Sequence, residues 1–268
     1  MARYLLNING YEYRITGKGE GMPFIWLHGM FHSPEVEDLF AAVDFDKLSR
    51  HFRVIRIELP AHGSSEVPSS ADRLTWSAIA RDVRQIVERT STGKYIAGGF
   101  SQGAAITAHL GLADANLSGA VLAMLPKIWD QREEVRQTYR KLLKRIAAGK
   151  GADYIRKVFQ LTHYPPVAMG WNPDLGNKVT ELMLKMPVPN MQMILEGAIL
   201  SDMPSPEILK TFTAPVIIAG WEDDLNHPME SCISAGAVIP RITEIIMTGK
   251  SDVNELTNKI IAFFGAKS

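Results

Sequence analysis

The segment YIAGGFSQGAA, residues 95–105, places a single serine between two glycines. Ser101 follows a short apolar run and precedes an alanine-rich one, and Gly99 and Gly103 flank it with the spacing G-x-S-x-G. Where this motif joins a strand to a helix, the small residues permit a sharp turn that lifts the serine hydroxyl out of the sheet. The motif therefore predicts a nucleophilic serine. The structural alternative is a glycine-rich loop that contains a serine by chance.

A serine hydroxyl needs a nearby base that accepts its proton. His227, in the stretch WEDDLNHP, is one candidate, because a histidine side chain ordinarily titrates at about pH 6.5. Asp223 precedes it on the same loop and could orient its ring, with Asp224 as the nearest substitute. Pro228 biases His227 toward an extended conformation before a helix. The spacing by itself does not establish that His227 reaches Ser101.

Apolar runs of strand length alternate with helical patterns through most of the chain, which indicates an α/β fold with a mostly parallel sheet flanked by helices. Asn9-Gly10 predicts the tight turn of an opening hairpin. Ligands bind beyond the carboxyl ends of the strands in such a sheet, where Ser101 lies. Strands are expected at residues 23–29, 53–63, 94–100, 117–125, 214–224 and 242–249. Helices are expected at residues 35–52, 75–90, 101–113 and 252–264, and from residue 228 onward.

The pattern changes between residues 127 and 212. This stretch is helical and strongly charged at first, is then broken by prolines and methionines, and contains no convincing strand. Because strands resume after it, we interpret residues 127–212 as a helical cap insertion. The α/β core would then consist of residues 1–126 and 213–268.

Several motifs together resemble those of the α/β-hydrolase superfamily, and the resemblance covers nearly the whole chain. LHGM looks like the oxyanion-hole loop of that family, ELPAHGSS resembles its D-x-P-G-H-G-x-S turn, and GFSQG is similar to its nucleophile elbow. GWEDD fits the pattern that holds the family's catalytic acid at Asp223. The resemblance implies a cap over the site and a nucleophilic Ser101. It also implies an oxyanion hole formed by the backbone N–H groups of Met30 and Gln102.

The resembled family places its catalytic histidine after the last strand. The corresponding stretch IIMTGKSDVNEL has no histidine, and Lys250 occupies the position where the family would have one. Three interpretations remain open. His227 could be the base, Lys250 could be the base if its pKa fell from about 10.4 to about 7, or the chain could lack a competent base. His28 and His62 are expected to fix loops by hydrogen bonds, while His28, His32 and Lys250 are candidates for lining the pocket.

Composition narrows the range of partners. The 268 residues include 29 basic and 29 acidic side chains, and no long block of one sign suggests nucleic acid or a membrane surface as a partner. We expect a small-molecule substrate, no metal ion and no cofactor, since neither a metal cluster nor a dinucleotide fingerprint is present. The single cysteine, Cys232, is compatible with a reducing compartment. With no signal peptide or membrane span in the pattern, a cytoplasmic protein is expected.

The residues thus favour a capped serine hydrolase that cleaves a small carboxylic ester or thioester through an acyl-enzyme on Ser101. The absent terminal histidine supports a different class, a ligand-binding or regulatory protein that keeps the pocket without turnover. A third class is another reaction on the same fold, such as that of a lyase or a cofactor-independent oxygenase.

Overall fold

The computed structural model describes residues 2–63, 65–91, 93–150, 173–221, 224–248 and 255–265. Its strands are β1 (Ala2–Ile8), β2 (Tyr11–Lys18), β3 (Pro23–Leu27), β4 (Arg53–Glu58), β5 (Tyr95–Phe100), β6 (Leu117–Ala123), β7 (Val216–Trp221) and β8 (Ile242–Thr248). Its α-helices are α1 (Pro34–Phe40), α2 (Phe45–Leu48), α3 (Trp76–Thr90), α4 (Gln102–Ala113), α5 (Arg132–Ala147), α7 (Pro173–Leu184), α8 (Val188–Ile199), α9 (Pro206–Leu209), α10 (Met229–Gly236) and α11 (Glu255–Phe264). Two 3₁₀ turns are η1 (Ala71–Leu74) and η2 (Trp129–Gln131).

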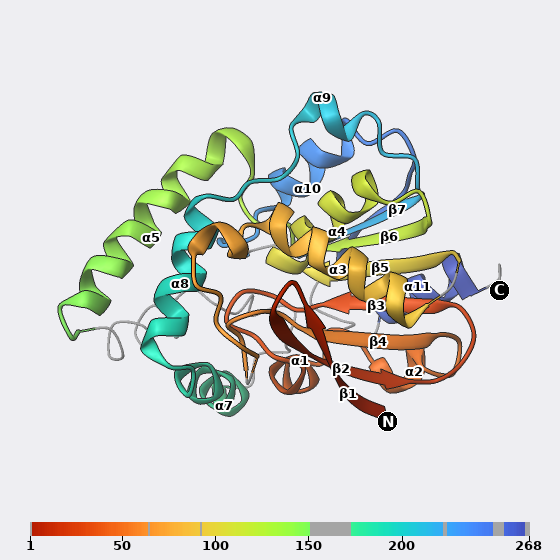
Figure 1. Cartoon of the computed structure of the whole chain (residues 1–268). Coiled ribbons are helices and arrows are strands. Elements are labelled where there is room, and N and C mark those ends of the chain that lie inside the picture. The colour runs from red at the N-terminus through yellow and green to blue at the C-terminus, as the bar shows by residue number, and fades with distance from the viewer. Residues whose placement is uncertain are drawn as a thin grey trace.

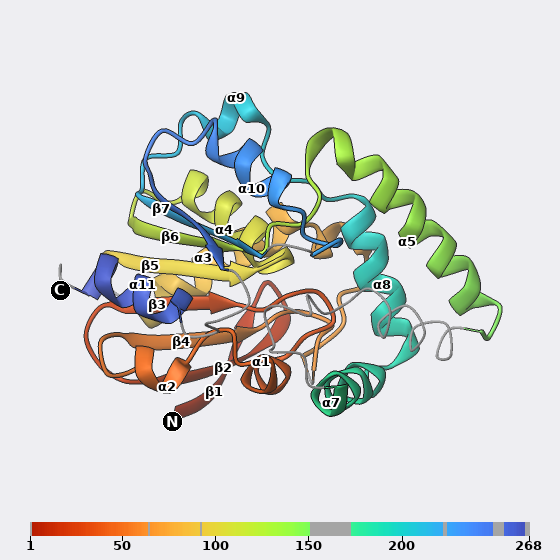
Figure 2. The same ribbon diagram turned by 180° about the vertical axis from the view of Figure 1, so that it is seen from behind.

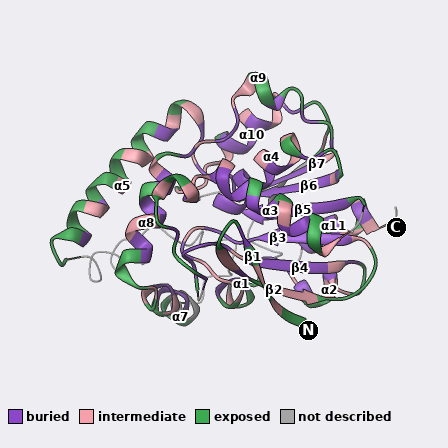
Figure 3. Cartoon of the chain, in the orientation of Figure 1, coloured by how far each residue is buried: buried purple, intermediate pink, exposed green. Residues whose placement is uncertain are grey.

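The strands of the described residues form one sheet in the order β1-β2-β4-β3-β5-β6-β7-β8 (Figure 1). The pairs β1–β2 and β2–β4 are antiparallel, and every pair from β4 to β8 is parallel. The prediction of an α/β fold with a mostly parallel sheet is confirmed. β3, β5 and β7 are buried along their whole length, as continuous apolar runs in a sheet covered on both faces should be (Figure 3).

Helices cover both faces of this sheet. α3 and α4 pack against each other on the face that is toward the viewer in Figure 1. α2 and α11 meet on the opposite face, which Figure 2 brings to the front. There the Asp44 backbone N–H donates to Thr257 Oγ1 at 2.9 Å. The C-terminal helix α11 thus holds the segment that follows β3.

The opening hairpin is confirmed. β1 and β2 join at Asn9 and Gly10, which have φ values of 53° and 88°. Positive φ at both central residues is typical of the primed turn that Asn-Gly favours, because its twist matches that of the strands.

The prediction of a single helix over residues 35–52 was wrong, because the structure has two helices there. α1 ends at Ala41, a residue in the left-handed conformation with φ 51°. A new helix, α2, begins after Asp44, whose side chain accepts a hydrogen bond from the Lys47 backbone N–H at 2.8 Å. The capping aspartate competes with helix continuation, and Ala42 and Val43 are buried at the break.

Three of the described helices between β6 and β7, namely α5, α7 and α8, lie together to one side of the sheet in both ribbon views (Figures 1 and 2). No strand occurs in residues 127–150 or 173–212. Arg132 of α5 connects two of these helices, since its Nε and Nη2 atoms donate to the carbonyls of Ser201 and Ala198 at 3.0 and 2.6 Å. Its guanidinium also stacks over Trp76, 4.5 Å from the ring centroid. The limits of residues 127–212 as a cap remain a prediction.

Candidate active site

Ser101 lies at the turn between β5 and α4. Its φ and ψ of 51° and −111° fall in a region that non-glycine residues rarely adopt. Its backbone N–H donates to the Ala123 carbonyl of the neighbouring strand at 3.0 Å, which holds the turn against the sheet. This strand–turn–helix context is the one that the G-x-S-x-G spacing predicts.

The two glycines of the motif leave room for the neighbouring strand. A Cβ atom at either Gly99 or Gly103 would collide with the carbonyl oxygen of Leu27, the last residue of β3. Gly99 also pairs with Leu27 in the sheet register. Both positions therefore require glycine because the backbone of β3 lies so close to them. The residue with the strained backbone conformation is Ser101.

The Ser101 hydroxyl contacts a histidine that is 126 residues away in the chain. Oγ of Ser101 lies 2.9 Å from Nε2 of His227, and Nδ1 of His227 lies 2.7 Å from Oδ2 of Asp224. The side chains of His227 and Asp224 are 13% and 3% exposed. A serine, a histidine and a carboxylate are thus connected in a largely enclosed line, with the histidine oriented by the acid.

Asp224 also organises its own loop. Its Oδ1 atom accepts hydrogen bonds from the backbone N–H groups of Asn226 and His227, at 2.9 and 3.1 Å. Burial acts to raise the pKa of Asp224, but the charge and hydrogen bond of His227 and the two backbone donors outweigh it and hold this pKa below its usual range. The acid is therefore ionised at neutral pH and accepts the Nδ1–H of His227.

The orienting carboxylate in the structure is that of Asp224. Asp223, which the sequence motif favours, lies outside the described residues, as does Lys250. α10 begins at Met229, one residue later than the helix expected from residue 228. Pro228 is its extended N-cap, and His227 directly precedes Pro228.

His28 does not line the cavity beside Ser101, although it was a pocket candidate. Its Nε2 atom accepts from the Leu59 backbone N–H at 3.0 Å, and its Nδ1 atom lies 2.9 Å from the Gly29 carbonyl. Its ring packs edge to face against that of His62, with 4.9 Å between the centroids. Burial lowers the pKa of both imidazoles below the usual histidine value. Both residues are neutral hydrogen-bonding groups that fix loops, which matches the other expectation for them.

The candidate oxyanion-hole residues, Met30 and Gln102, belong to segments next to Ser101. Met30, in the loop after β3, lines the cavity that contains Ser101. Gln102 is the first residue of α4, where a backbone N–H has no partner within its own helix. Both amides belong to segments that meet where the Leu27 carbonyl approaches Gly103.

The cavity around Ser101 has a volume of about 270 Å³. Its floor includes Ser101, His227, Met30 and His32. One wall comes from α5, which contributes apolar and polar side chains, namely Val135, Thr138, Tyr139 and Leu142. The participation of α5 was not predictable residue by residue, because its sequence resembles that of an exposed charged helix. The only signal was its position between two strands.

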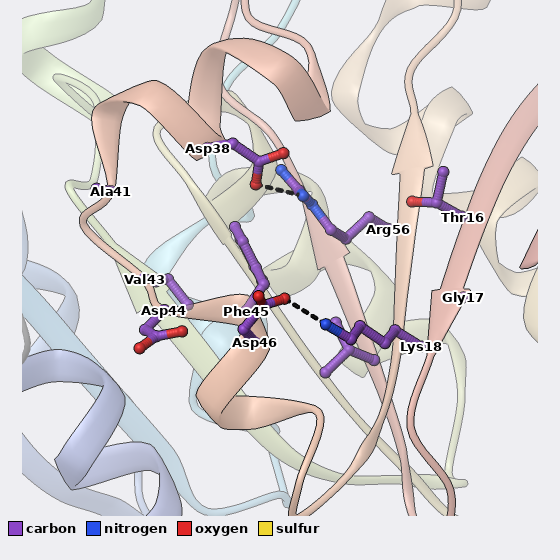
Figure 4. Close-up of a pocket in the computed structure, with 11 residues that line it drawn as sticks. Thr16, Gly17, Lys18, Asp38, Ala41, Val43, Asp44, Phe45, Asp46 and Arg56 are labelled. Atoms are coloured by element: carbon purple, nitrogen blue, oxygen red, sulfur yellow. Dashed lines mark hydrogen bonds and ion pairs between the residues drawn. The ribbon is translucent and has the colours of Figure 1, made fainter. Parts of the chain in front are cut away.

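A larger cavity of about 410 Å³ lies away from this site, among β2, β4 and the α1–α2 segment (Figure 4). Four of its five charged side chains form two ion pairs. Arg56 Nη1 lies 2.6 Å from Asp38 Oδ1, and Lys18 Nζ lies 2.6 Å from Asp46 Oδ1. It contains neither the serine nor the histidine, so size does not identify the reactive cavity here.

Two further properties concern the described residues only. None of their helices is long and apolar enough to cross a membrane. Among the same residues, no three histidine, cysteine, aspartate or glutamate side chains gather in a way that could hold a metal ion.

Comparison with known proteins agrees with this fold. A model described as "Alpha/beta hydrolase family" matches residues 24–252. An enol-lactonase from Burkholderia xenovorans has a similar structure with a TM-score of 0.81, 15% identity, and coverage of 97% of this chain and 99% of the other. An esterase from Thermogutta terrifontis has a TM-score of 0.75, 20% identity, and coverage of 93% and 91%. An esterase from a Rhodococcus species has a TM-score of 0.74, 17% identity, and coverage of 100% and 99%. No curated protein matches the sequence.

Proposed function

Because the chain belongs to the alpha/beta hydrolase family, we propose that it is a serine hydrolase that cleaves a small carboxylic ester or thioester through an acyl-enzyme on Ser101. The observation that carries the proposal is the line of contacts from Ser101 Oγ through His227 to Asp224, at 2.9 and 2.7 Å. Such a line is the arrangement that activates a serine hydroxyl.

In the proposed reaction, Oγ of Ser101 attacks the carbonyl carbon while Nε2 of His227 accepts the hydroxyl proton. The N–H groups of Met30 and Gln102 stabilise the developing oxyanion. His227 then gives the proton to the leaving alkoxide or thiolate, which departs and leaves Ser101 acylated. A water molecule repeats these steps, with His227 first as base and then as acid, and releases the carboxylic acid. Asp224 stays ionised and holds the Nδ1–H of His227 throughout.

The cavity supports a small substrate. Its volume of about 270 Å³ is below the ~300–1,000 Å³ of most drug-sized ligand pockets. Apolar side chains such as Phe100, Met124 and Leu142 line it, which suits a short acyl chain. We infer that residues 127–212 act as a cap, since α5 contributes one wall of the cavity.

Hydrolysis of p-nitrophenyl acetate and p-nitrophenyl butanoate, together with labelling by a fluorophosphonate probe, tests this proposal. Ser101→Ala should lose at least about a thousandfold in kcat/KM and all labelling. Ser70→Ala is the matched control, because Ser70 is exposed and its side chain makes no capping hydrogen bond. Equal rates and labelling in wild type and Ser101→Ala would overturn the proposal. A wild type that is neither labelled nor active would favour the ligand-binding alternative.

A further inference from the structure

The cavity beside Ser101 contains a second histidine close to a buried carboxylate. His32 lines this cavity from the loop after β3, and 12% of its side chain is exposed. Its Nδ1 atom lies 4.0 Å from Oε1 of Glu37, which is on α1 and is 1% exposed. Neither residue takes part in the proposed serine chemistry, so the pair needs an explanation of its own.

Glu37 is held firmly behind the loop that carries Met30. Its Oε2 atom accepts a hydrogen bond from Nε1 of Trp26 at 2.8 Å, and Trp26 is a buried residue of β3. A carboxyl group enclosed in this way is costly to keep charged unless positive or hydrogen-bonding groups compensate it. Burial of Glu37 therefore favours the protonated form of its carboxyl group.

Charged or titratable groups among the described residues surround the pair. Arg56 of β4 and Asp38 of α1 act on Glu37, and His28 at the end of β3 interacts with His32. Glu35 and Lys185 line a second cavity with His32, and the cavity beside Ser101 also contains Lys127, Arg132, Glu134 and His227. Burial raises the pKa of Glu37 to about 7, although Arg56 and the Trp26 hydrogen bond act to lower it and Asp38 acts to raise it. The ion pair of Arg56 with Asp38, drawn in Figure 4, moderates the influence of both.

His32 lines the cavity, and its Nδ1 atom is enclosed on the side of Glu37. The opposite edge of the ring, which contains Nε2, is therefore the candidate for contact with a substrate. A protonated Glu37 carboxyl favours the imidazole tautomer with its hydrogen on Nε2, which is then a donor. An ionised Glu37 favours the tautomer with its hydrogen on Nδ1, which makes Nε2 an acceptor.

We propose that His32 contacts the substrate as a hydrogen-bond donor beside the scissile carbonyl, and that Glu37 is the positioning residue that controls the protonation of its ring. The proposal rests on the serine hydrolase function above. It identifies the substrate class as esters or thioesters that carry an oxygen acceptor near the scissile carbonyl. His32, Met30 and Ser101 line the same cavity, which puts His32 within the site where the proposed oxyanion would develop.

Two pairs of esters that differ by one atom test the contact. Methoxyacetate and butanoate p-nitrophenyl esters differ by an ether oxygen in place of a methylene on the acyl side. Methoxyethyl and butyl esters of butanoic acid differ in the same way on the alcohol side. His32→Phe should reduce the kcat/KM ratio of ether to alkyl substrate about three- to tenfold in at least one pair, the effect of one lost neutral hydrogen bond.

Two variants serve as comparisons for His32→Phe. His32→Gln keeps a donor and should restore part of the ratio. His51→Phe changes an exposed histidine and should leave the ratio at the wild-type value. A change below twofold in both ester pairs would overturn the contact.

The pH dependence of the same ratio tests the role of Glu37. In wild type the ratio should fall as pH rises through about 7, the raised pKa of Glu37, because the donor at Nε2 is lost. Ionisations of the free enzyme that affect both substrates equally cancel in this ratio. In Glu37→Gln the ratio should not change over this range. Glu35→Gln, an exposed position on the same helix, should behave like wild type. A ratio that is constant with pH in wild type would exclude the role of Glu37.

Nitrogen chemical shifts of His32 separate this inference from the proposed function, because they are measured on the resting enzyme. They should change with pH in wild type around neutrality and should lose that change in Glu37→Gln. An inactive wild type with these shifts intact would contradict the hydrolase proposal alone. An active wild type whose His32 shifts ignore Glu37 would contradict the pair alone.

Discussion

Nδ1 of His227 lies 2.7 Å from Oδ2 of Asp224, which is three residues earlier on the same loop. Asp224 Oδ1 simultaneously accepts from the backbone N–H of His227. The loop after β7 therefore holds acid and histidine as one unit, with the ring fixed before substrate arrives. This arrangement explains how a histidine so close to its carboxylate in sequence can still direct Nε2 at Ser101.

Replacing the acid should abolish most activity while leaving the fold intact. Asp224→Asn keeps the size of the side chain but no longer favours the Nδ1–H tautomer of His227, so we expect kcat to fall about a thousand- to ten-thousandfold on p-nitrophenyl acetate. Asp223→Asn is the matched control and should retain most of the rate. A larger loss in Asp223→Asn than in Asp224→Asn would assign the acid to Asp223.

The base is tested by comparing two variants. His227→Gln should lose at least about a thousandfold in kcat/KM, since no other group contacts Ser101 Oγ among the described residues. Lys250→Met should stay within about threefold of wild type. Steady-state ester hydrolysis measures both, and circular dichroism checks that each variant is folded. If Lys250→Met lost more activity than His227→Gln, the lysine interpretation would replace the present one.

The elbow at Ser101 could be predicted because its signal is local. Strand, glycines and helix adjoin one another in sequence, and the Asn9-Gly10 turn is readable for the same reason. The contact of Asp224 with His227 could not be predicted from the sequence, because it depends on the conformation of the loop. That conformation includes the turn formed when Asp224 accepts two backbone N–H groups.

Other features of the site depend on contacts distant in sequence. The sequence around Glu37 is typical of a solvent-exposed helix. Glu37 is nevertheless buried against Trp26, and burial raises its pKa. The break between α1 and α2 depends on the capping side chain of Asp44, which the helical apolar pattern obscured. A single sequence does not display contacts such as that of Glu37 with Trp26, because they form only when the sheet brings these segments together.

The collision at Gly103 predicts a loss of stability. Gly103→Ala would push a methyl group into the Leu27 carbonyl oxygen of β3, and backbone atoms cannot move aside without distorting the sheet. We expect a loss of about 2–3 kcal/mol or more in the free energy of unfolding, measured by urea denaturation. Gly17→Ala is the control, because a Cβ there meets no atom within 4 Å. Equal stability of the two variants would show that Leu27 is not the constraint.

The buried His62 predicts a stability that decreases in mild acid. Burial lowers the pKa of His62 to about 4, although the Pro60 carbonyl acts to raise it. The unfolded chain binds this proton at about pH 6.5, so it holds more protons than the folded chain between these values, and the free energy of unfolding must fall as pH decreases. Above pH 6.5 His62 causes no loss of stability. At pH 5 the preferential protonation of the unfolded chain lowers the free energy of unfolding by about 2 kcal/mol. His62→Gln should reduce the pH 7-to-5 difference in urea-derived stability by about this amount, whereas His51→Gln, at an exposed position, should not. A wild-type slope retained in His62→Gln would show that His62 is protonated in the folded protein at pH 5, and would thereby contradict its assignment as a neutral buried group.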